Sequence, residues 1–129
     1  MFRMNSVVKI ASLILISAAA AQSAFAMSAR ECVAQQRELS ETAVELQTTQ
    51  QEIAALAEQA ELAGDEYVSA QEMSGWSDAH LAEAQRLEVE FNTLRDEVHT
   101  RQNTLAFDAS QFNQKRAVFQ EECAAYFVD

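Results

Sequence analysis

The chain contains no proline, and only two of its 129 residues are glycine, so very few residues can interrupt a helix. One glycine, Gly75, lies within the central stretch 74–78. The only two cysteines, Cys32 and Cys123, lie almost symmetrically on either side of that stretch. These scarce residues predict an all-α fold, a long antiparallel two-helix coiled-coil hairpin whose open end is closed by a Cys32–Cys123 disulfide.

Basic side chains are also scarce, with nine lysines and arginines against twenty acidic residues and a formal net charge of -11. This balance argues against a nucleic-acid partner, because binding to phosphates needs basic patches. It also argues against adsorption to anionic lipid. A basic protein partner fits the charge, but an acidic surface also simply keeps an elongated protein in solution.

The first 26 residues have the three parts of a secretory signal peptide. Arg3 and Lys9 form a positive region, residues 10–21 are mostly apolar, and residues 24–26 form a small-x-small cleavage site. The apolar run is shorter than the roughly 20 residues that a membrane span needs. We therefore expect cleavage after Ala26, a periplasmic or secreted protein and no membrane span after cleavage. Retention of the segment as an N-terminal anchor is the alternative.

Two cysteines in an exported chain suit one intramolecular disulfide. There is no CxxC motif, and His80 and His99 lie far from both cysteines in any hairpin. The sequence therefore predicts no metal site, no redox site and no cofactor. An intermolecular bridge is the alternative use of the cysteines.

The expected domain, residues 27–129, consists of a helix over 28–73, a turn over 74–77 and a helix over 78–127. Ser28 and Glu31 have the spacing of a capping box at the start of the first helix. Gly75 can adopt the left-handed conformation that ends a helix. Ser77 is a good N-cap for the second helix.

Apolar residues recur every seven positions in both helices, as in a coiled coil. We pair this first series with a second series, whose members lie four residues after those of the first. The first series is Cys32, Leu39, Leu46, Ile53, Ala60 and Tyr67, then Ala84, Phe91, Val98, Leu105, Phe112, Phe119 and Tyr126. The second series is Gln36, Ala43, Gln50, Ala57, Gly64 and Gln71, then Leu81, Glu88, Arg95, Gln102, Ala109, Arg116 and Cys123.

The expected disulfide determines which residues face each other across the hairpin. It places Phe91 opposite Gly64 and Phe112 opposite Ala43, so a large side chain meets a small one. This pairing explains a glycine inside a helix, where it costs about 1 kcal/mol relative to alanine. A hinge at Gly64 is the alternative.

Five further apolar residues share one side of the half nearest the turn, and an apolar patch of this kind suggests a contact surface. The simplest use of this candidate interaction strip is self-association into a homodimer with a four-helix bundle. Docking of another protein, holding of unfolded clients, or no role at all are the alternatives. The strip is Leu56, Ala63, Ala70, Leu87 and Leu94, and no role is assigned to Val44, Leu62, Val89, Phe107 or Val118.

Trp76, the only tryptophan, immediately precedes the expected N-cap. Its spacing from Leu81 favours a hydrophobic staple. The alternative is an exposed aromatic contact at the tip of the hairpin.

No catalytic constellation is present: HExxH and CxxC motifs and glycine-rich phosphate loops are absent. His99 and Asp96 form at most an ordinary pair on a helix surface. We therefore expect an exported, non-enzymatic structural or adaptor protein of the cell envelope that acts by self-association or by docking on a protein partner. The alternatives are a periplasmic holdase-like chaperone and an acidic inhibitor of a basic secreted protein. The expected shape is similar to the helical hairpins of periplasmic chaperones and adaptor subunits, but a fold does not imply a function.

Overall fold

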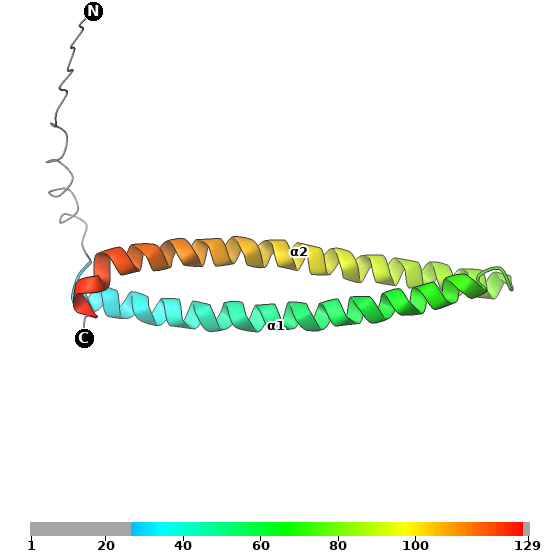
Figure 1. The fold of residues 1–129 in the computed structure, drawn as a ribbon, viewed down its shortest axis with the longest axis horizontal. Coiled ribbons are helices and arrows are strands. Elements are labelled where there is room, and N and C mark those ends of the chain that lie inside the picture. Colours follow the sequence, from blue (N-terminus) through cyan, green and yellow to red (C-terminus); the bar gives the residue numbers. More distant parts are fainter. Residues whose placement is uncertain (1–26, 128–129) are drawn as a thin grey trace, which may run out of the picture.

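The computed structural model describes residues 27–127, and the expected signal peptide lies outside this range. Helix α1 spans Ala29–Met73, helix α2 spans Asp78–Cys123, and a short 3-10 helix, η1, spans Ala124–Tyr126. The two long helices lie side by side and antiparallel, with the turn at one end and both ends of the described chain at the other (Figure 1). At 1.5 Å per residue, each helix is about 68 Å long. The predicted two-helix hairpin is thereby confirmed.

The open end of the hairpin is closed by the predicted disulfide between Cys32 and Cys123. Their Cα atoms are 5.7 Å apart, and both residues are fully buried. Next to the bridge, the Tyr126 hydroxyl donates a hydrogen bond of 3.1 Å to the Met27 carbonyl. The rings of Phe119 and Phe127 also pack with their centroids 5.5 Å apart. The bridge therefore lies inside a small closed cap rather than at a frayed end.

Helix α1 begins with the capping box that its sequence predicts. The Glu31 amide donates to the Ser28 hydroxyl at 3.2 Å, and the Ser28 amide donates to the Glu31 carboxylate at 2.7 Å. Two of the amides that have no partner within the helix are thereby satisfied.

The turn ends α1 without the expected left-handed glycine. Ser74 closes the helix in a right-handed conformation, with φ -60° and ψ -26°. Its amide and its hydroxyl both donate to the Gln71 carbonyl, and the Trp76 amide donates to that of Met73. These bonds satisfy the carbonyls of Gln71 and Met73, and Gly75 does not adopt the left-handed conformation. Ser77 then caps α2 as predicted, by accepting a hydrogen bond from the His80 amide at 3.3 Å.

The second helix ends at Cys123, four residues before its predicted end at 127. The chain tightens there into η1, which brings Tyr126 back to Met27. The disulfide partner is therefore the last residue of α2.

The seam between the helices follows the first predicted series, but of the predicted second series it fully buries only Cys123. Leu39, Ile53 and Ala60 of the first series are buried on α1. The second buried series begins three residues after the first, instead of four, and includes Ala63 and Ala70. Most of the predicted second series is exposed, for example Gln36, Gln50, Gln71, Glu88, Arg95, Gln102 and Arg116. The physical reason is that the observed second series buries mainly alanine and leucine side chains near the turn. The predicted second series would have buried glutamine, glutamate and arginine side chains.

Candidate interaction surfaces

The candidate interaction strip is part of this seam and is not a free surface. Ala63, Ala70 and Leu87 are only 6%, 7% and 7% exposed. Leu56 and Leu94 are half-buried. Ala70, Ala84 and Leu87 form a core cluster against which Tyr67 packs. The prediction that the strip lies on the outside was wrong, because the strip supplies the apolar contacts of the hairpin itself.

The predicted approach of Phe91 to Gly64 is confirmed. A Cβ atom added at Gly64 would lie 3.0 Å from Cε2 of Phe91, closer than such atoms normally come. The Phe91 ring also stacks with Tyr67, with 6.3 Å between centroids. Gly64 therefore makes room for an aromatic side chain of the opposite helix.

The tip of the hairpin presents Trp76, which is 72% exposed. Its ring contacts His80 edge-on, with 5.6 Å between centroids, and His80 Nδ1 lies 2.7 Å from the Ser77 hydroxyl. Leu81 is 45% exposed, so a staple that buries Trp76 and Leu81 is not formed. The structure instead places the only tryptophan at the far end from the disulfide, held at one edge and open on the rest of its surface.

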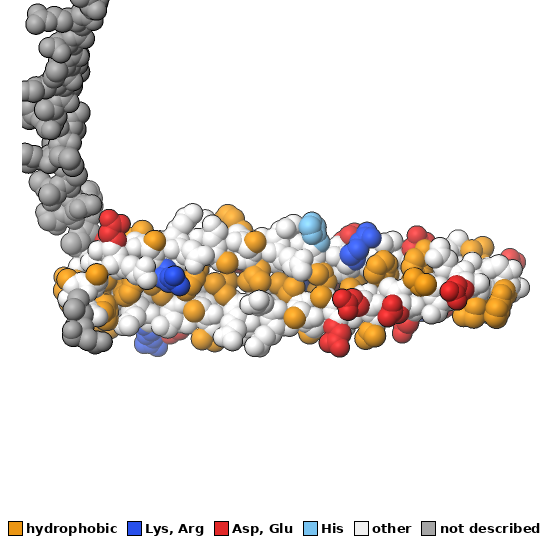
Figure 2. Space-filling model, in the orientation of Figure 1, with side chains coloured by type: hydrophobic (Ala, Val, Ile, Leu, Met, Phe, Trp, Pro, Cys, Tyr) orange, Lys and Arg blue, Asp and Glu red, His pale blue; other side chains and the backbone are white. Residues whose placement is uncertain are grey.

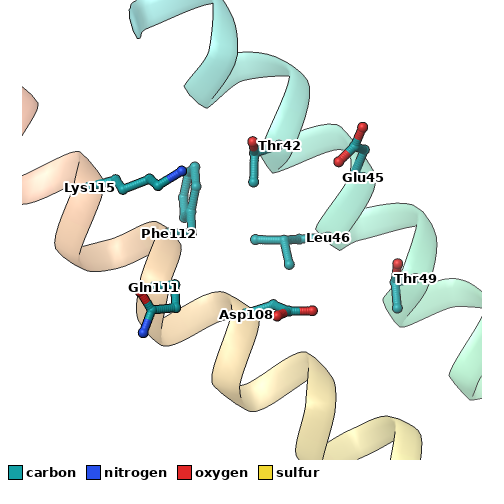
Figure 3. A pocket seen from close by; sticks show the side chains of 8 residues that line it. All are labelled: Thr42, Glu45, Leu46, Thr49, Asp108, Gln111, Phe112 and Lys115. Atoms are coloured by element: carbon teal, nitrogen blue, oxygen red, sulfur yellow. The ribbon is translucent and has the colours of Figure 1, made fainter.

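One row of side chains beside the seam is strongly acidic. Seven glutamates recur at multiples of seven residues within each helix, and all are exposed. Glu45 lines a hollow of about 260 Å³ beside Leu46 and Phe112 (Figure 3), and Glu66 and Glu83 line another nearer the turn. We call this the acidic row: Glu38, Glu45, Glu52 and Glu66 on α1, with Glu83, Glu90 and Glu97 on α2.

Basic side chains pair with some members of the acidic row. Arg86 bonds Glu83 at 2.8 Å and Glu90 at 3.0 Å, and Lys115 reaches across the hairpin to Glu38 at 3.1 Å. Hydrogen bonds from Arg86 lower the pKa of the Glu83 carboxyl. Both groups are well exposed, so such pairs contribute little to stability. The row as a whole lies on the surface.

The row on the other side of the seam is almost neutral. It carries one glutamate, Glu88, and two arginines, Arg95 and Arg116. Ala43, Gln50, Gln102 and Ala109 of this row line a second hollow, of about 510 Å³, beside the same Leu46 and Phe112. We call this the neutral row: Gln36, Ala43, Gln50, Ala57, Gly64 and Gln71 on α1, with Leu81, Glu88, Arg95, Gln102, Ala109 and Arg116 on α2.

The space-filling view shows apolar side chains in a line between the two helices (Figure 2). Acidic side chains on this face gather in the half toward the turn (Figure 2). Both hollows beside Leu46 and Phe112 are open and shallow, without the enclosure that a small-molecule site needs.

In the part of the chain that the structure describes, no group of three or more histidine, cysteine or acidic side chains could hold a metal ion. None of the helices within residues 27–127 is long and apolar enough to cross a membrane. No family model, curated protein or solved structure matches the chain. The candidate surfaces therefore have to be interpreted from their own chemistry.

The acidic row was missed by the interpretation of the sequence, although a signal for it was present. The seven-residue spacing of its glutamates is visible without a structure. The residues of the neutral row were recognised, as the second series without Cys123, but they were wrongly predicted to be buried in the seam. What could not be seen was on which side of the seam each row lies, because that depends on which series of residues is buried.

Proposed function

We propose that the protein is an exported, non-enzymatic structural or adaptor component of the cell envelope, which acts by docking on a protein partner or by self-association. The observation that carries this proposal is the position of Trp76. The single tryptophan is 72% exposed at the apex of a hairpin about 68 Å long, while the opposite end is closed covalently. The export and the envelope location rest on the signal-peptide pattern of residues 1–26.

Trp76 supports docking for a physical reason. Tryptophan is strongly enriched among the residues that dominate the energy of protein interfaces. Burying a large aromatic side chain on a partner contributes about 1.5–3 kcal/mol from desolvation alone. Because Trp76 packs only edge-on against His80, most of that gain is still available for a partner.

The test is capture of a partner from a cell-envelope extract by the mature, oxidised protein. Trp76→Ala is expected to weaken capture by at least about tenfold, in line with the loss of an interface anchor. Phe107→Ala is the matched control, because Phe107 is also a large aromatic residue, 64% exposed, but lies on the arm. Both variants should melt like the parent. Capture that Trp76→Ala and Phe107→Ala leave equally unchanged would contradict docking through the tip.

A second candidate, binding of a basic secreted protein, is supported by the acidic row. Its seven carboxylates lie along one side of both helices. Binding through them should weaken steeply as salt rises, because exposed charges are screened beyond about 10 Å at 0.1 M salt. Docking through Trp76 should be much less sensitive, so a salt series in the same capture experiment separates the two. The holdase alternative depended on the apolar strip, which the hairpin buries.

A further inference from the structure

We propose that two copies of the chain pack face to face through their neutral rows, with the acidic rows on the two outer sides of a four-helix bundle. The contact joins the open halves of the two hairpins in antiparallel orientation. This inference rests on the self-association part of the proposed function and names its surface.

The charge of the two rows determines which sides can meet. An acidic row brings seven carboxylates, of which Arg86, Arg101 and Lys115 pair with four, so two such rows would still meet with an excess of negative charge on both sides. Like charges placed opposite each other across an interface cost several kcal/mol. The neutral row has one acidic and two basic members, so two copies of it can approach without strong repulsion. Of the two rows beside the seam, the neutral row is therefore the one that can accept a second copy of this acidic protein.

The seam is incompletely covered on the side of the neutral row. Leu46, Leu105 and Phe112 are only half-buried and border the hollow of about 510 Å³. Ala43, Ala106 and Ala109 line the same hollow. Small side chains let two helix surfaces come close, and burial of the three larger ones would then add apolar contact area. A partner laid over this hollow completes the core that two helices alone leave open.

The amides around the hollow suit an identical partner. Gln47, Gln50 and Gln102 line it and are exposed. A glutamine side chain both donates and accepts hydrogen bonds, so the same residue type can satisfy itself across a two-fold axis. Placing the axis at this hollow pairs the amides of one copy with those of the other.

The distribution of charge along the hairpin favours the antiparallel orientation. Residues 54–100, toward the turn, contain eleven acidic side chains and two basic ones. The described remainder, toward the disulfide, contains eight acidic and five basic ones. Antiparallel overlap of the open halves keeps the two highly acidic halves at opposite ends. It also presents Trp76 of each copy at opposite ends of the assembly.

The test is the mass of the mature, oxidised protein by sedimentation over a range of concentrations. The variant Gln50→Glu/Gln102→Glu places charge in the neutral row. Gln59→Glu/Gln111→Glu is its matched control, since it makes the same change at exposed positions on the same two helices, beside the acidic row. We expect a dimer for the parent and the control. For the neutral-row variant we expect a dissociation constant raised by at least about tenfold.

Two further measurements test the geometry. Higher salt should strengthen the parent dimer slightly, because the two open halves in contact each carry eight acidic and five basic side chains and salt screens their net repulsion. The maximum dimension from small-angle scattering should be about 80 Å or slightly more, longer than one hairpin of about 68 Å. A dimer no longer than one hairpin would overturn the antiparallel overlap.

Other results overturn the proposal itself. A parent protein that stays monomeric at all concentrations would overturn it. So would a dimer that both double variants weaken equally. A monomer that loses a captured partner only in the neutral-row variant would show that the row binds a different protein. A monomeric parent that still captures a partner through Trp76 would overturn self-association and leave the docking function intact.

Discussion

Gly64 has no side chain, and this allows the two helices to come close together at that point. A Cβ atom at position 64 would lie 3.0 Å from Cε2 of the Phe91 ring, which also stacks with Tyr67. A larger residue at position 64 would therefore displace the ring and disturb this stacking. This contact outweighs the cost of glycine in a helix, which is about 1 kcal/mol.

Replacement of Gly64 by leucine is expected to destabilise the hairpin by about 1–3 kcal/mol, as other overpacked contacts do. The reason is the clash with Phe91, so the double variant Gly64→Leu/Phe91→Ala should lose less than the sum of its single changes. Chemical denaturation of the four proteins measures this coupling. Strict additivity would show that the two residues do not contact each other in solution.

Glu31 makes the start of α1 sensitive to pH. Its hydrogen bond from the Ser28 amide, followed by that with the Ser28 hydroxyl, lowers the pKa of the carboxyl below 4.5. A carboxyl with a lowered pKa stabilises the fold above its ordinary pKa and loses this contribution as the pH falls through the lowered value.

The difference in Tm between the parent and Glu31→Ala should therefore be full at pH 7, shrink below about pH 4.5 and vanish in stronger acid. Thermal melts from pH 7 to pH 2 measure it. Glu52→Ala, another exposed position on α1, controls for the general effect of removing a negative charge. A difference for Glu31→Ala that persists in strong acid would mean that the capping carboxylate does not contribute.

Local residue signals predicted three of the four helix ends closely, because they depend on neighbours in the sequence. The capping box at Ser28 and the N-cap at Ser77 are both formed. The predicted left-handed conformation of Gly75 was wrong, because Ser74 closes α1 by hydrogen bonds that the sequence did not predict. The early end of α2 was missed because it depends on Tyr126 meeting Met27, a contact far apart in the sequence.

At the scale of the elements, the seam crosses α2 obliquely. Near the turn it uses Leu87 and Leu94 beside the first series, but toward the disulfide it uses Ala109 and Cys123. The reason is composition: the row that holds Leu87 and Leu94 continues as Arg101, Asp108 and Lys115, which stay exposed. A single heptad assignment for the whole helix could not describe both halves. The hairpin and its disulfide were therefore predictable, whereas the second buried series was not.

The disulfide reinforces the half of the hairpin with the poorer seam. Near it, the side-chain oxygen of Gln35 is buried without a hydrogen-bond partner among the described residues. The bridge links residues 91 apart in sequence, so it lowers the conformational entropy of the unfolded chain by closing a long loop.

The variant Cys32→Ser/Cys123→Ser should lose about 2–4 kcal/mol of unfolding free energy. Its amides should exchange with solvent first near positions 32 and 123, while those beside Ala70 and Leu87 stay protected. Denaturation and hydrogen exchange measured by mass spectrometry follow both effects. Reducing agent should leave the variant unchanged, and a variant that melts like the oxidised parent would contradict a stabilising bridge.

At the scale of the whole molecule, the hairpin has two different sides. The composition shows an acidic protein but not that seven glutamates share one side of the seam, while the opposite row is nearly neutral. That arrangement depends on the rotation of each helix about its axis. If the buried series shifts by one residue, a different row faces the partner helix and a different row lies beside the seam. The candidate surfaces were therefore less predictable than the fold.

The Cys32–Cys123 bridge also has a mechanical consequence. A force that pulls on the two ends of the domain passes directly between Cys32 and Cys123 through their covalent bond. It therefore does not separate the two helices from the open end of the hairpin. The residues between the cysteines form a slack loop that carries no load. If the bridge is cut, the same force can unzip the hairpin and release roughly 300 Å of extended chain. The disulfide thus determines whether the domain behaves as a short, stiff link or as a long, extensible one.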